Sequence, residues 1–206
     1  MGSLTAPEKV VGRPLKIIGL AGSMRKASGN KGLLRAVAEI AEEEYAEAVQ
    51  VEIVEIGHLP FVNPDLEQQG IVPESVLEFR RKVKEADAVI FAAPEYNYSV
   101  SAVLKNALDW ASRPPNMWAA KPAAVLSAAG GSGGSRAQYH LRQIGVFLDL
   151  HFINKPEVFV KAHEGLTKFD LDGNLIDADT RARVRQLLVT LRTFTLRLLA
   201  GSCYRC

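Results

Sequence analysis

The sequence is poor in cysteine and has no histidine pattern that would bind a metal. Its only two cysteines, Cys203 and Cys206, stand at the C-terminal end with C-x-x-C spacing. Four histidines are scattered through the chain without a pair at ligand spacing. With no second cysteine pair and no histidine beside this one, incidental thiols are favoured over a metal or redox pair. The sequence therefore predicts no metal site.

An excess of charge and long apolar runs are missing too. The 25 lysines and arginines nearly balance the 23 aspartates and glutamates, which leaves a net charge of +2. A polyanionic partner such as nucleic acid is therefore not expected. No apolar run approaches the length that spans a bilayer, and the first residues lack the apolar core of a signal peptide. These absences predict a cytoplasmic protein with no membrane span, whose partners are small molecules.

What the sequence does contain is a regular alternation of apolar strands and amphipathic helices. Strands are expected at residues 15–21, 49–54, 88–93, 123–128 and 157–160, and helices at residues 31–47, 74–86, 101–110, 136–148 and 179–199. Residues 58–73 predict a long irregular connection, and Asp172-Gly173-Asn174 predicts a hairpin turn. The length fits one such domain at residues 14–200, with a flexible arm at 1–13 and a tail at 201–206.

This alternation predicts an α/β fold built on a doubly wound parallel sheet. The five strands are expected in the order 2-1-3-4-5, with helices on both faces and right-handed crossovers. In that order ligands bind outside the carboxyl ends of the strands, at the switch between the first and third strands. The loops after the first, third and fourth strands should therefore line one crevice, and we treat them as one candidate site.

The loop after the first strand, residues 22–30, has the chemistry of an anion site. Ser23, Ser28 and Asn30 offer hydrogen-bond donors, and Arg25 offers a charged guanidinium, at the start of a helix whose dipole favours an anion. The loop has neither the G-x-G-x-x-G spacing of a dinucleotide fold nor the Gly-Lys-Ser/Thr ending of a Walker loop. The alternative is that a polar side chain merely caps the helix and the arginine is a solvated charge.

The other two loops predict a surface for a flat ring. The loop after the third strand carries an acid, an asparagine, a serine and tyrosines at residues 94–99, and the fourth strand runs into glycines and serines at residues 129–135. Glycine lets a ligand approach the backbone closely. One anion loop beside two such loops describes a mononucleotide with a planar ring. Flavin mononucleotide (FMN) fits this description better than a dinucleotide does.

Three motifs in this order also resemble a known family. They are Gly22-Ser23-x-Arg25-x-x-Ser28-x-Asn30, Pro94-Glu95-Tyr96-Asn97-x-Ser99, and the glycine-rich run before Arg136-Ala137. They resemble the motifs of the NADPH-dependent FMN reductase family, in particular its plant-type NAD(P)H:quinone reductase branch, and the resemblance extends from residue 15 to residue 199. It implies a flavodoxin-like fold.

The resemblance also implies which residues bind the cofactor. Ser23, Arg25, Ser28 and Asn30 would bind the FMN phosphate. Pro94, Glu95, Tyr96 and Asn97, with Ser99 in the same loop, would hold the edge of the isoalloxazine ring, largely through backbone groups. Ser127, Gly130, Gly131, Ser132, Gly133 and Gly134 would lie along the ring and the ribityl chain. Relatives assemble as dimers or tetramers with the flavin near a subunit interface, and the loops around Tyr98 and Trp118 are expected there, whereas Trp110 is expected to be buried.

The activity implied is an FMN-dependent NAD(P)H:quinone oxidoreductase. NADPH or NADH would donate a hydride to flavin N5 and leave, and a quinone would then accept the hydride in a ping-pong reaction. No side chain is expected to be an obligatory catalytic group, so Glu95→Ala should weaken flavin placement rather than abolish an acid-base step.

Alternatives remain open at this point. One is another reductase of the same family, acting on FMN, azo dyes or chromate. A flavodoxin-like electron carrier would bind FMN but not NADPH, although such carriers are usually acidic. A phosphate-handling hydrolase is disfavoured because residues 22–30 contain no cysteine nucleophile. The sequence does not decide between NADPH and NADH, or between quinones and other acceptors.

Overall fold

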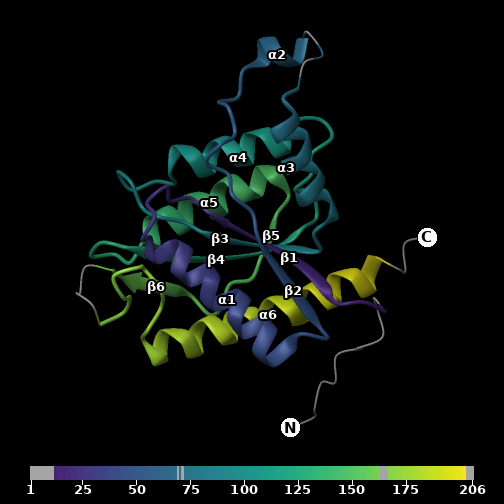
Figure 1. Ribbon diagram of the computed structural model, residues 1–206. Coiled ribbons are helices and arrows are strands. Elements are labelled where there is room, and N and C mark those ends of the chain that lie inside the picture. The colour runs from purple at the N-terminus through teal and green to yellow at the C-terminus, as the bar shows by residue number, and fades with distance from the viewer. Residues whose placement is uncertain (1–11, 69, 71, 163–166, 203–206) are drawn as a thin grey trace.

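The computed structural model describes residues 12–68, 70, 72–162 and 167–202. Most of the predicted N-terminal arm lies outside these residues, and so do Cys203 and Cys206 of the predicted tail. The chain forms an α/β structure with one sheet between two layers of helices (Figure 1). Within the described residues, no helix is both long enough and apolar enough to cross a membrane.

The central sheet confirms the predicted strand order. Its strands are β1 (Leu15–Ala21), β2 (Val49–Ile53), β3 (Ala88–Ala92), β4 (Pro122–Ala129), β5 (His151–Phe152) and β6 (Val158–Lys161). They follow the order β2-β1-β3-β4-β5, and β6 pairs with β4 as well. Every pairing is parallel, as the alternation of strands and helices requires. All carboxyl ends of the strands therefore lie at one edge of the sheet, on the left in Figure 1.

The predicted fifth strand is divided into two short strands. β5 pairs with the start of β4, at Pro122 and Ala123, and β6 pairs with its end, from Leu126 to Ala129. The prediction at residues 157–160 found only the second half. Pro156 stands between the halves and has no N–H to donate to a ladder, so pairing is interrupted there.

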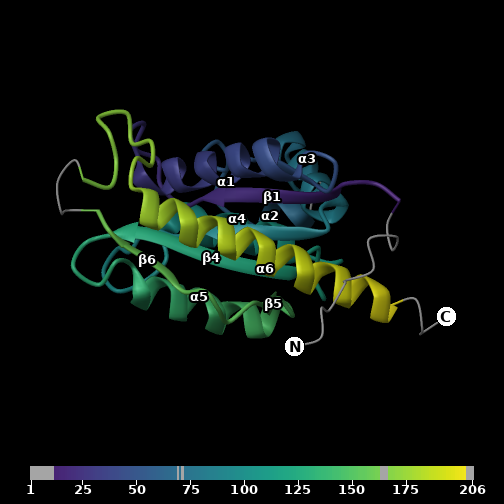
Figure 2. The same ribbon diagram turned by 90° about the horizontal axis from the view of Figure 1, so that it is seen from below.

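Helices cover both faces of the sheet. α1 (Gly29–Tyr45) and α6 (Ala178–Ser202) lie side by side on one face, and α3 (Glu74–Glu85), α4 (Ala102–Ser112) and α5 (Ser135–Leu148) lie on the other (Figures 1 and 2). Neighbouring residues of a strand point to opposite faces, so Ile17 belongs to the core under α1 and α6 while Ile18 belongs to the core under α3, α4 and α5. The nearly continuous apolar strands of the sequence follow from this double burial.

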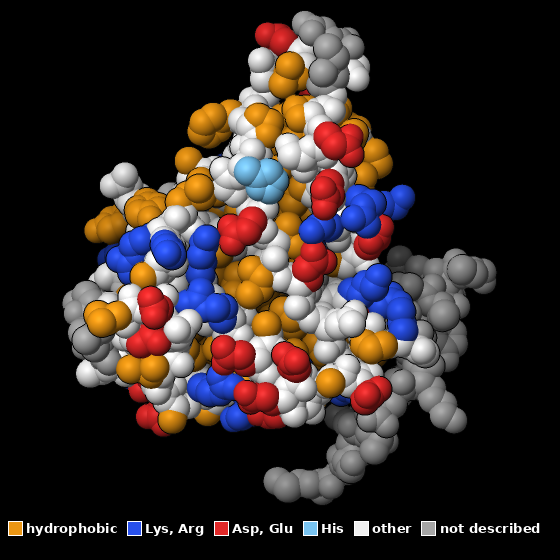
Figure 3. All heavy atoms as spheres, in the orientation of Figure 1, with side chains coloured by type: hydrophobic (Ala, Val, Ile, Leu, Met, Phe, Trp, Pro, Cys, Tyr) orange, Lys and Arg blue, Asp and Glu red, His pale blue; other side chains and the backbone are white. Residues whose placement is uncertain are grey.

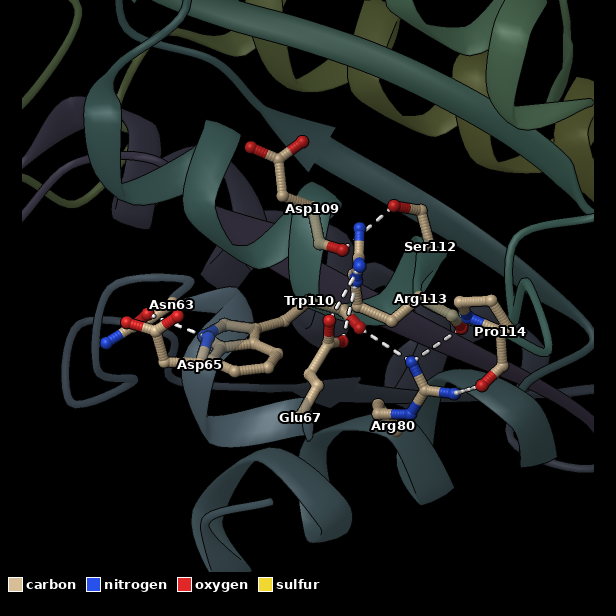
Figure 4. A network of polar contacts seen from close by, with 9 residues as sticks. All are labelled: Asn63, Asp65, Glu67, Arg80, Asp109, Trp110, Ser112, Arg113 and Pro114. Carbon is tan, nitrogen blue, oxygen red and sulfur yellow. Dashed lines mark hydrogen bonds and ion pairs between the residues drawn. The ribbon is translucent and has the colours of Figure 1, made fainter. Parts of the chain in front are cut away.

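The connection from β2 to α3 projects from the body of the molecule and contains a short helix, α2 (Pro64–Gln68). We expected no regular structure there. Asn63 accepts a hydrogen bond from the N–H of Asp65 at 3.0 Å, and Pro64 suits the first helical position, so one short turn forms. Glu67 of α2 forms an ion pair with Arg113 at 2.6 Å, which ties the projection to the end of α4 (Figure 4).

Arg80 of α3 closes the end of α4 at the same place. Its guanidinium donates to the backbone oxygens of Trp110 at 2.7 Å and Arg113 at 2.8 Å, and its contact with Pro114 is also drawn in Figure 4. The last carbonyls of a helix have no partner within the helix, so a side chain that binds several of them stabilises its end. This polar network fixes the outer part of the β2–α3 connection to the end of α4.

Candidate functional site

The three predicted loops meet at the carboxyl edge of the sheet. The N–H of Gly22, directly after β1, donates to the oxygen of Ala92 at the end of β3 at 2.9 Å. Ser101 Oγ, at the start of α4, donates to the oxygen of Gly22 at 2.6 Å. A Cβ at Gly22 would stand 2.8 Å from that Oγ, so only glycine fits there. The loops after β1 and β3 therefore form one unit.

The N-terminus of α1 has no cap of its own. Ser28 is the N-cap residue, yet its side chain makes no capping hydrogen bond, and the first turn carries no acidic residue. Ser23 and Ser28 are only 6% and 3% exposed, and neither hydroxyl has a hydrogen-bond partner among the described residues. The free N–H groups of the first turn carry the positive end of the helix dipole. The start of α1 therefore offers donors without acceptors, as an anion site requires.

The cations of this loop are exposed beside the free helix end. Arg25 folds back so that Nε and Nη2 donate to the oxygen of Ala27 at 3.1 and 2.8 Å. Lys26 is exposed next to it. Figure 3 shows lysine and arginine side chains gathered on the left of the face it draws, at the carboxyl edge of the sheet. The guanidinium of Arg25 contacts only a residue of its own loop. A change of side-chain rotamer would therefore be enough to release it toward a phosphate.

Asn30 links the first loop to the third. Its Nδ2 donates to the oxygen of Ala128 at 2.7 Å, and its Oδ1 accepts from the N–H of Ala128 at 2.9 Å. The side chain is buried, so this double hydrogen bond fixes the distance between α1 and the end of β4. Asn30 neither caps α1 nor stands free in the crevice. One N–H of its amide remains for a ligand.

The predicted hairpin packs on the start of α1, a contact that sequence reasoning missed. Phe169 and Leu175 form an antiparallel bridge, which confirms the turn. A Cβ at Gly32 of α1 would stand 1.8 Å from the oxygen of Gly173, and a Cβ at Gly173, whose φ is +78°, would stand 3.0 Å from the nitrogen of Ser28. Two glycines thus allow two backbones to touch. The sequence does show glycines at positions 32 and 173, but nothing in it indicates that these two glycines contact each other.

The hairpin is also held by side chains. Arg35 Nε donates to Asn174 Oδ1 at 2.8 Å. Asp170 accepts from Nδ2 of Asn174 at 3.0 Å and from the N–H groups of Asp172 and Asn174 at 3.0 and 2.7 Å. These contacts, led by the Asn174 side chain, lower the pKa of its carboxyl group. The anion loop therefore rests against a rigid turn on the side away from β3.

The loop after β3 forms a tight turn beside the crevice. Tyr96 and Ser99 exchange two backbone hydrogen bonds, at 3.0 and 2.9 Å. The two central residues, Asn97 and Tyr98, have φ values of 50° and 66°. A turn with two positive φ angles suits asparagine, whereas for tyrosine this conformation is uncommon and strained. Such strain persists only where the surroundings hold it.

Helix α5 holds this turn. Arg136 places its guanidinium carbon 4.1 Å from the centre of the Tyr98 ring, and Ser99 Oγ lies 2.9 Å from Nδ1 of His140. A cation over an aromatic face is attracted by the ring quadrupole. Tyr96 and Tyr98 remain 55% and 66% exposed, so their rings face the surroundings rather than the core.

Glu95 caps helix α5 from the neighbouring loop. One carboxylate oxygen accepts from the N–H groups of Arg136 and Ala137 at 3.0 and 3.2 Å, and the other accepts from Ser132 Oγ at 3.0 Å. Burial alone would raise the pKa of Glu95, but these hydrogen bonds favour the carboxylate and hold the pKa below its ordinary value. Its carboxylate thus stands at the N-terminus of α5, a role that the sequence did not predict.

The loop after β4 is shaped by glycine. Gly133 and Gly134 have φ values of 62° and 88°. A Cβ at Gly130 or Gly131 would have no atom within 4 Å, so open space lies above these two residues. Ser127 is fully buried and donates to the oxygen of Gly133 at 2.5 Å, so its side chain supports the loop from below. The open side of the loop can receive a flat ligand, and Ser127 acts through the loop backbone.

The two tryptophans are both in the core. Trp110 is 1% exposed, which confirms the expectation of burial. Trp118 is 0% exposed, its Nε1 donates to the oxygen of Leu108 at 2.9 Å, and its ring packs against Phe79 and Phe91. The Trp118 side chain therefore belongs to the core, and the prediction that the loop around it contributes to a subunit interface stays a prediction. Tyr98, the other residue named for that role, is exposed.

The arrangement defines the class of protein. A parallel sheet in this order, with an uncapped helix and two further loops at its switch point, is a flavodoxin-like fold. The hydroxyls of two largely buried serines and the free N–H groups of α1 fit a phosphate, and the open space over the glycine loop fits the flat ring of FMN. Among the described residues, no group of three or more metal-binding side chains is placed to hold a metal ion.

The chain belongs to the NADPH-dependent FMN reductase family, whose sequence model matches residues 15–165. It is 56% identical over 184 residues to an NADPH:quinone oxidoreductase of Arabidopsis thaliana, covering 89% of this chain and 93% of that one. It is 42% identical to an NAD(P)H-dependent FMN reductase of Pseudomonas aeruginosa, covering 89% and 97%. The solved structure of the flavoenzyme NAD(P)H:(acceptor) oxidoreductase FerB from Paracoccus denitrificans superposes with a TM-score of 0.75 at 30% identity, covering 89% and 98%.

Proposed function

We propose that this chain is an FMN-dependent NAD(P)H:quinone oxidoreductase. The observation that carries the proposal is the uncapped N-terminus of α1, which Ser23 and Ser28 flank without capping it, at the same end of the sheet as the open glycine loop. The relatives named above support the choice of substrates, because the plant protein is an NADPH:quinone oxidoreductase at 56% identity. FMN would supply the hydride-transfer chemistry by accepting two electrons from NAD(P)H and passing them to a quinone.

The residues of this chain bind and orient. Ser23, Ser28, Arg25 and the free N–H groups of α1 would hold the phosphate, with one N–H of Asn30 in reach. The backbone of residues 94–99, fixed by α5, would hold the ring edge, and residues 130–134 would lie along the ring and the ribityl chain. In this proposal none of these side chains donates a proton or attacks a substrate.

One opening would serve both substrates in turn. Gly130 and Gly131 leave one side of the third loop open, and the sequence contains only one loop with the pattern of an anion site. NAD(P)H and the quinone would therefore stack at the same place successively, which is the basis of a ping-pong order. Parallel initial-rate lines are expected when both concentrations are varied, and intersecting lines would contradict this order.

A homodimer or homotetramer in the cytoplasm completes the proposal. Exposed tyrosines at 96 and 98 support contact with another subunit, since aromatic side chains are enriched at interfaces. The balanced charge supports a small-molecule acceptor rather than a polyanionic partner. Fractionation of cells that produce the tagged chain would test the location.

The decisive experiment is a reduction cycle followed by absorbance. The purified protein is expected to be yellow with the absorbance of bound FMN, to bleach anaerobically with NADPH and to recover its colour when a quinone is added. A protein that binds FMN but is not bleached by NADPH or NADH would be an electron carrier instead. A colourless protein that binds no added FMN would overturn the proposal.

A further inference from the structure

The hairpin at residues 168–177 is fixed at its base to the start of α6. Lys168 Nζ lies 3.0 Å from Asp177 Oδ1, and this ion pair joins the two arms of the hairpin. The other carboxylate oxygen of Asp177 accepts from the N–H of Thr180, in the first turn of α6, at 2.8 Å. Helix α6 itself packs against α1 on the same face of the sheet (Figure 2). The hairpin therefore extends from a rigid base.

The tip of the hairpin is fixed to α1. Arg35, in the second turn of α1, donates from Nε to Asn174 Oδ1 at 2.8 Å and from Nη2 to the oxygen of Asp172 at 3.2 Å. Asn174 is held in turn by Asp170, which accepts from its backbone N–H and from its Nδ2. One side chain of α1 thus fixes the position of the tip.

Between its base and its tip the hairpin covers the start of α1. A Cβ at Gly173 would stand 2.7 Å from the carbonyl carbon of Ala27 and 3.0 Å from the nitrogen of Ser28, so the hairpin backbone lies against the peptide that opens the helix. A Cβ at Gly29 would stand 3.0 Å from the ring of Phe169. In Figures 1 and 2 the segment that leads into α6 lies beside the start of α1. One side of the anion loop is therefore formed by the hairpin.

This contact supports a helix end that has no cap. The first turn of a helix tends to fray when no side chain accepts from its N–H groups. Ser28 supplies no such hydrogen bond at α1. Two contacts from outside the helix replace it, one between Asn30 and Ala128 and the other between the hairpin and the peptide before Ser28. A loop that is ordered before its ligand arrives binds that ligand more tightly.

We propose that the hairpin is a clamp that orders the anion loop, and that Arg35 and Asn174 are positioning residues for the phosphate of FMN. Neither side chain needs to touch the phosphate, because both act through the contact of Gly173 with the peptide before Ser28. The identity of the anion rests on the proposed function. The clamp itself is a property of the protein without its cofactor, so it can be tested with and without FMN.

The first test measures fraying of α1 in the apoprotein by amide hydrogen exchange. The N–H of Gly32 donates to the oxygen of Ser28 at 2.9 Å and is freed when the first turn frays. Arg35→Ala should speed its exchange by roughly three- to tenfold, because the tip of the hairpin is released. Arg185→Ala is the matched control, since Arg185 of α6 pairs with Glu44 at the other end of α1. Unchanged exchange in Arg35→Ala, or equal acceleration in both variants, would overturn the clamp.

The second test compares FMN with riboflavin, which has no phosphate. If the released loop is competent for about a tenth to a third of the time, Arg35→Ala and Asn174→Ala should weaken FMN binding roughly three- to tenfold. Riboflavin binding should change by less than about twofold, because its ring contacts lie on other loops. Arg35→Lys keeps one donor toward Asn174 and should recover part of the loss. Unchanged FMN affinity, or an equal loss for both flavins, would overturn the positioning role.

The third test separates the contact at Gly173 from its backbone conformation. Gly173→Ala adds a Cβ against the anion loop at a φ of +78°, whereas Gly70→Ala imposes similar strain at +70° with no atom within 4 Å. Gly173→Ala should weaken FMN binding by about tenfold or more, and Gly70→Ala should bind like wild type. Gly173→Asn tolerates the positive φ but keeps the Cβ, so it should also bind weakly. Affinity like that of wild type in a folded Gly173 variant would overturn the contact, and Arg35→Ala decides if neither variant folds.

Failure of the clamp and failure of the proposed function give different results. Hydrogen exchange at Gly32 needs no flavin. A wild type that binds neither FMN nor riboflavin would refute the proposed function, while the exchange rates of Arg35→Ala and Arg185→Ala would still confirm or overturn the clamp. A wild type that binds FMN no better than Arg35→Ala does would refute the positioning role and leave the proposed function standing.

Discussion

Helices α1 and α5 begin at the same edge of the sheet, yet their N-termini are treated in opposite ways. At α5 the carboxylate of Glu95 reaches across from another loop and accepts hydrogen bonds from Arg136 and Ala137. At α1 neither Ser28 nor an acidic residue of the first turn supplies such a cap. One helix is given an anion by the protein, and the other is left to receive one from a ligand. The N-terminus of α5 is thus part of the supporting structure, whereas the N-terminus of α1 is available to bind an anion.

The strongest way to break this difference is to give α1 its own anion. Ser28→Asp should lower FMN affinity by roughly two to three orders of magnitude, because two like charges about 4 Å apart near a protein surface repel by about 4 kcal/mol. The apoprotein should gain about 0.5–1 kcal/mol from a charged N-cap. Fluorescence titration with FMN and urea unfolding of the apoprotein measure the two effects. Ser28→Asn, a neutral cap of similar size, is the control, and equal FMN affinity for both variants would refute the anion site.

Removing the anion of α5 is the converse change. Glu95→Gln should cost the apoprotein about 1.5–3 kcal/mol of unfolding free energy, because hydrogen bonds to a charged acceptor are lost at a helix end. FMN affinity should fall less than in Ser28→Asp, since the phosphate site is untouched and only the turn is loosened. Glu42→Gln, at an exposed position of α1, should leave the urea midpoint unchanged. A stable Glu95→Gln protein would show that the capping carboxylate is dispensable.

The loop cation should contribute less than either helix end. Arg25→Ala is expected to weaken FMN binding about tenfold, the value of one charge-assisted hydrogen bond, with no change in thermal stability because the side chain is exposed. Lys26→Ala is the neighbouring control and should change the affinity by a smaller factor. Riboflavin has no phosphate. If Arg25→Ala weakens riboflavin binding as much as it weakens FMN binding, the arginine does not contact the phosphate.

Acidic pH should weaken the capping of α5 by Glu95 and so reduce the difference between the two helix N-termini. This is the smallest of the expected effects. The folded-state pKa of Glu95 is lowered from an ordinary value of 4.5, so its stabilising contribution is present above that pH and is lost as the pH falls through the folded pKa. The stability gap between wild type and Glu95→Gln should therefore be constant near neutral pH and narrow below about 4.5. Thermal melts of both apoproteins across this range measure it, and a gap that widens in acid would contradict the assignment.

Local sequence patterns were enough to predict the order of the strands in the sheet and the three loops that form the candidate site. Uniformly apolar runs such as residues 88–93 identify central strands, and glycine and serine runs after them identify the loops. The divided fifth strand was missed because Pro156 interrupts pairing inside what reads as one segment. Boundaries of the helices differed by up to three residues, as for α6, which ends at Ser202 rather than at residue 199.

Roles that depend on contacts between segments far apart in the chain could not be predicted from the sequence. Glu95 was expected to hold the ring edge largely through its backbone. The capping role of its carboxylate was missed, because nothing near it in the chain shows that α5 begins without a capping side chain of its own. Asn30 was read as a phosphate donor, but most of its amide is used to hold Ala128. Both residues were singled out correctly as unusual, and the tertiary structure supplies what they touch.

The docking of the hairpin on α1 has a consequence for the order of events during synthesis. Gly173 closes over Gly32 and Ser28, so the pocket for the phosphate acquires one of its walls from a segment made long after the loop itself. While the ribosome is still adding the residues before this hairpin, the nascent sheet can form with α1 in place but with that wall missing. Capture of the cofactor should therefore be a late event, completed only when the last third of the chain has emerged.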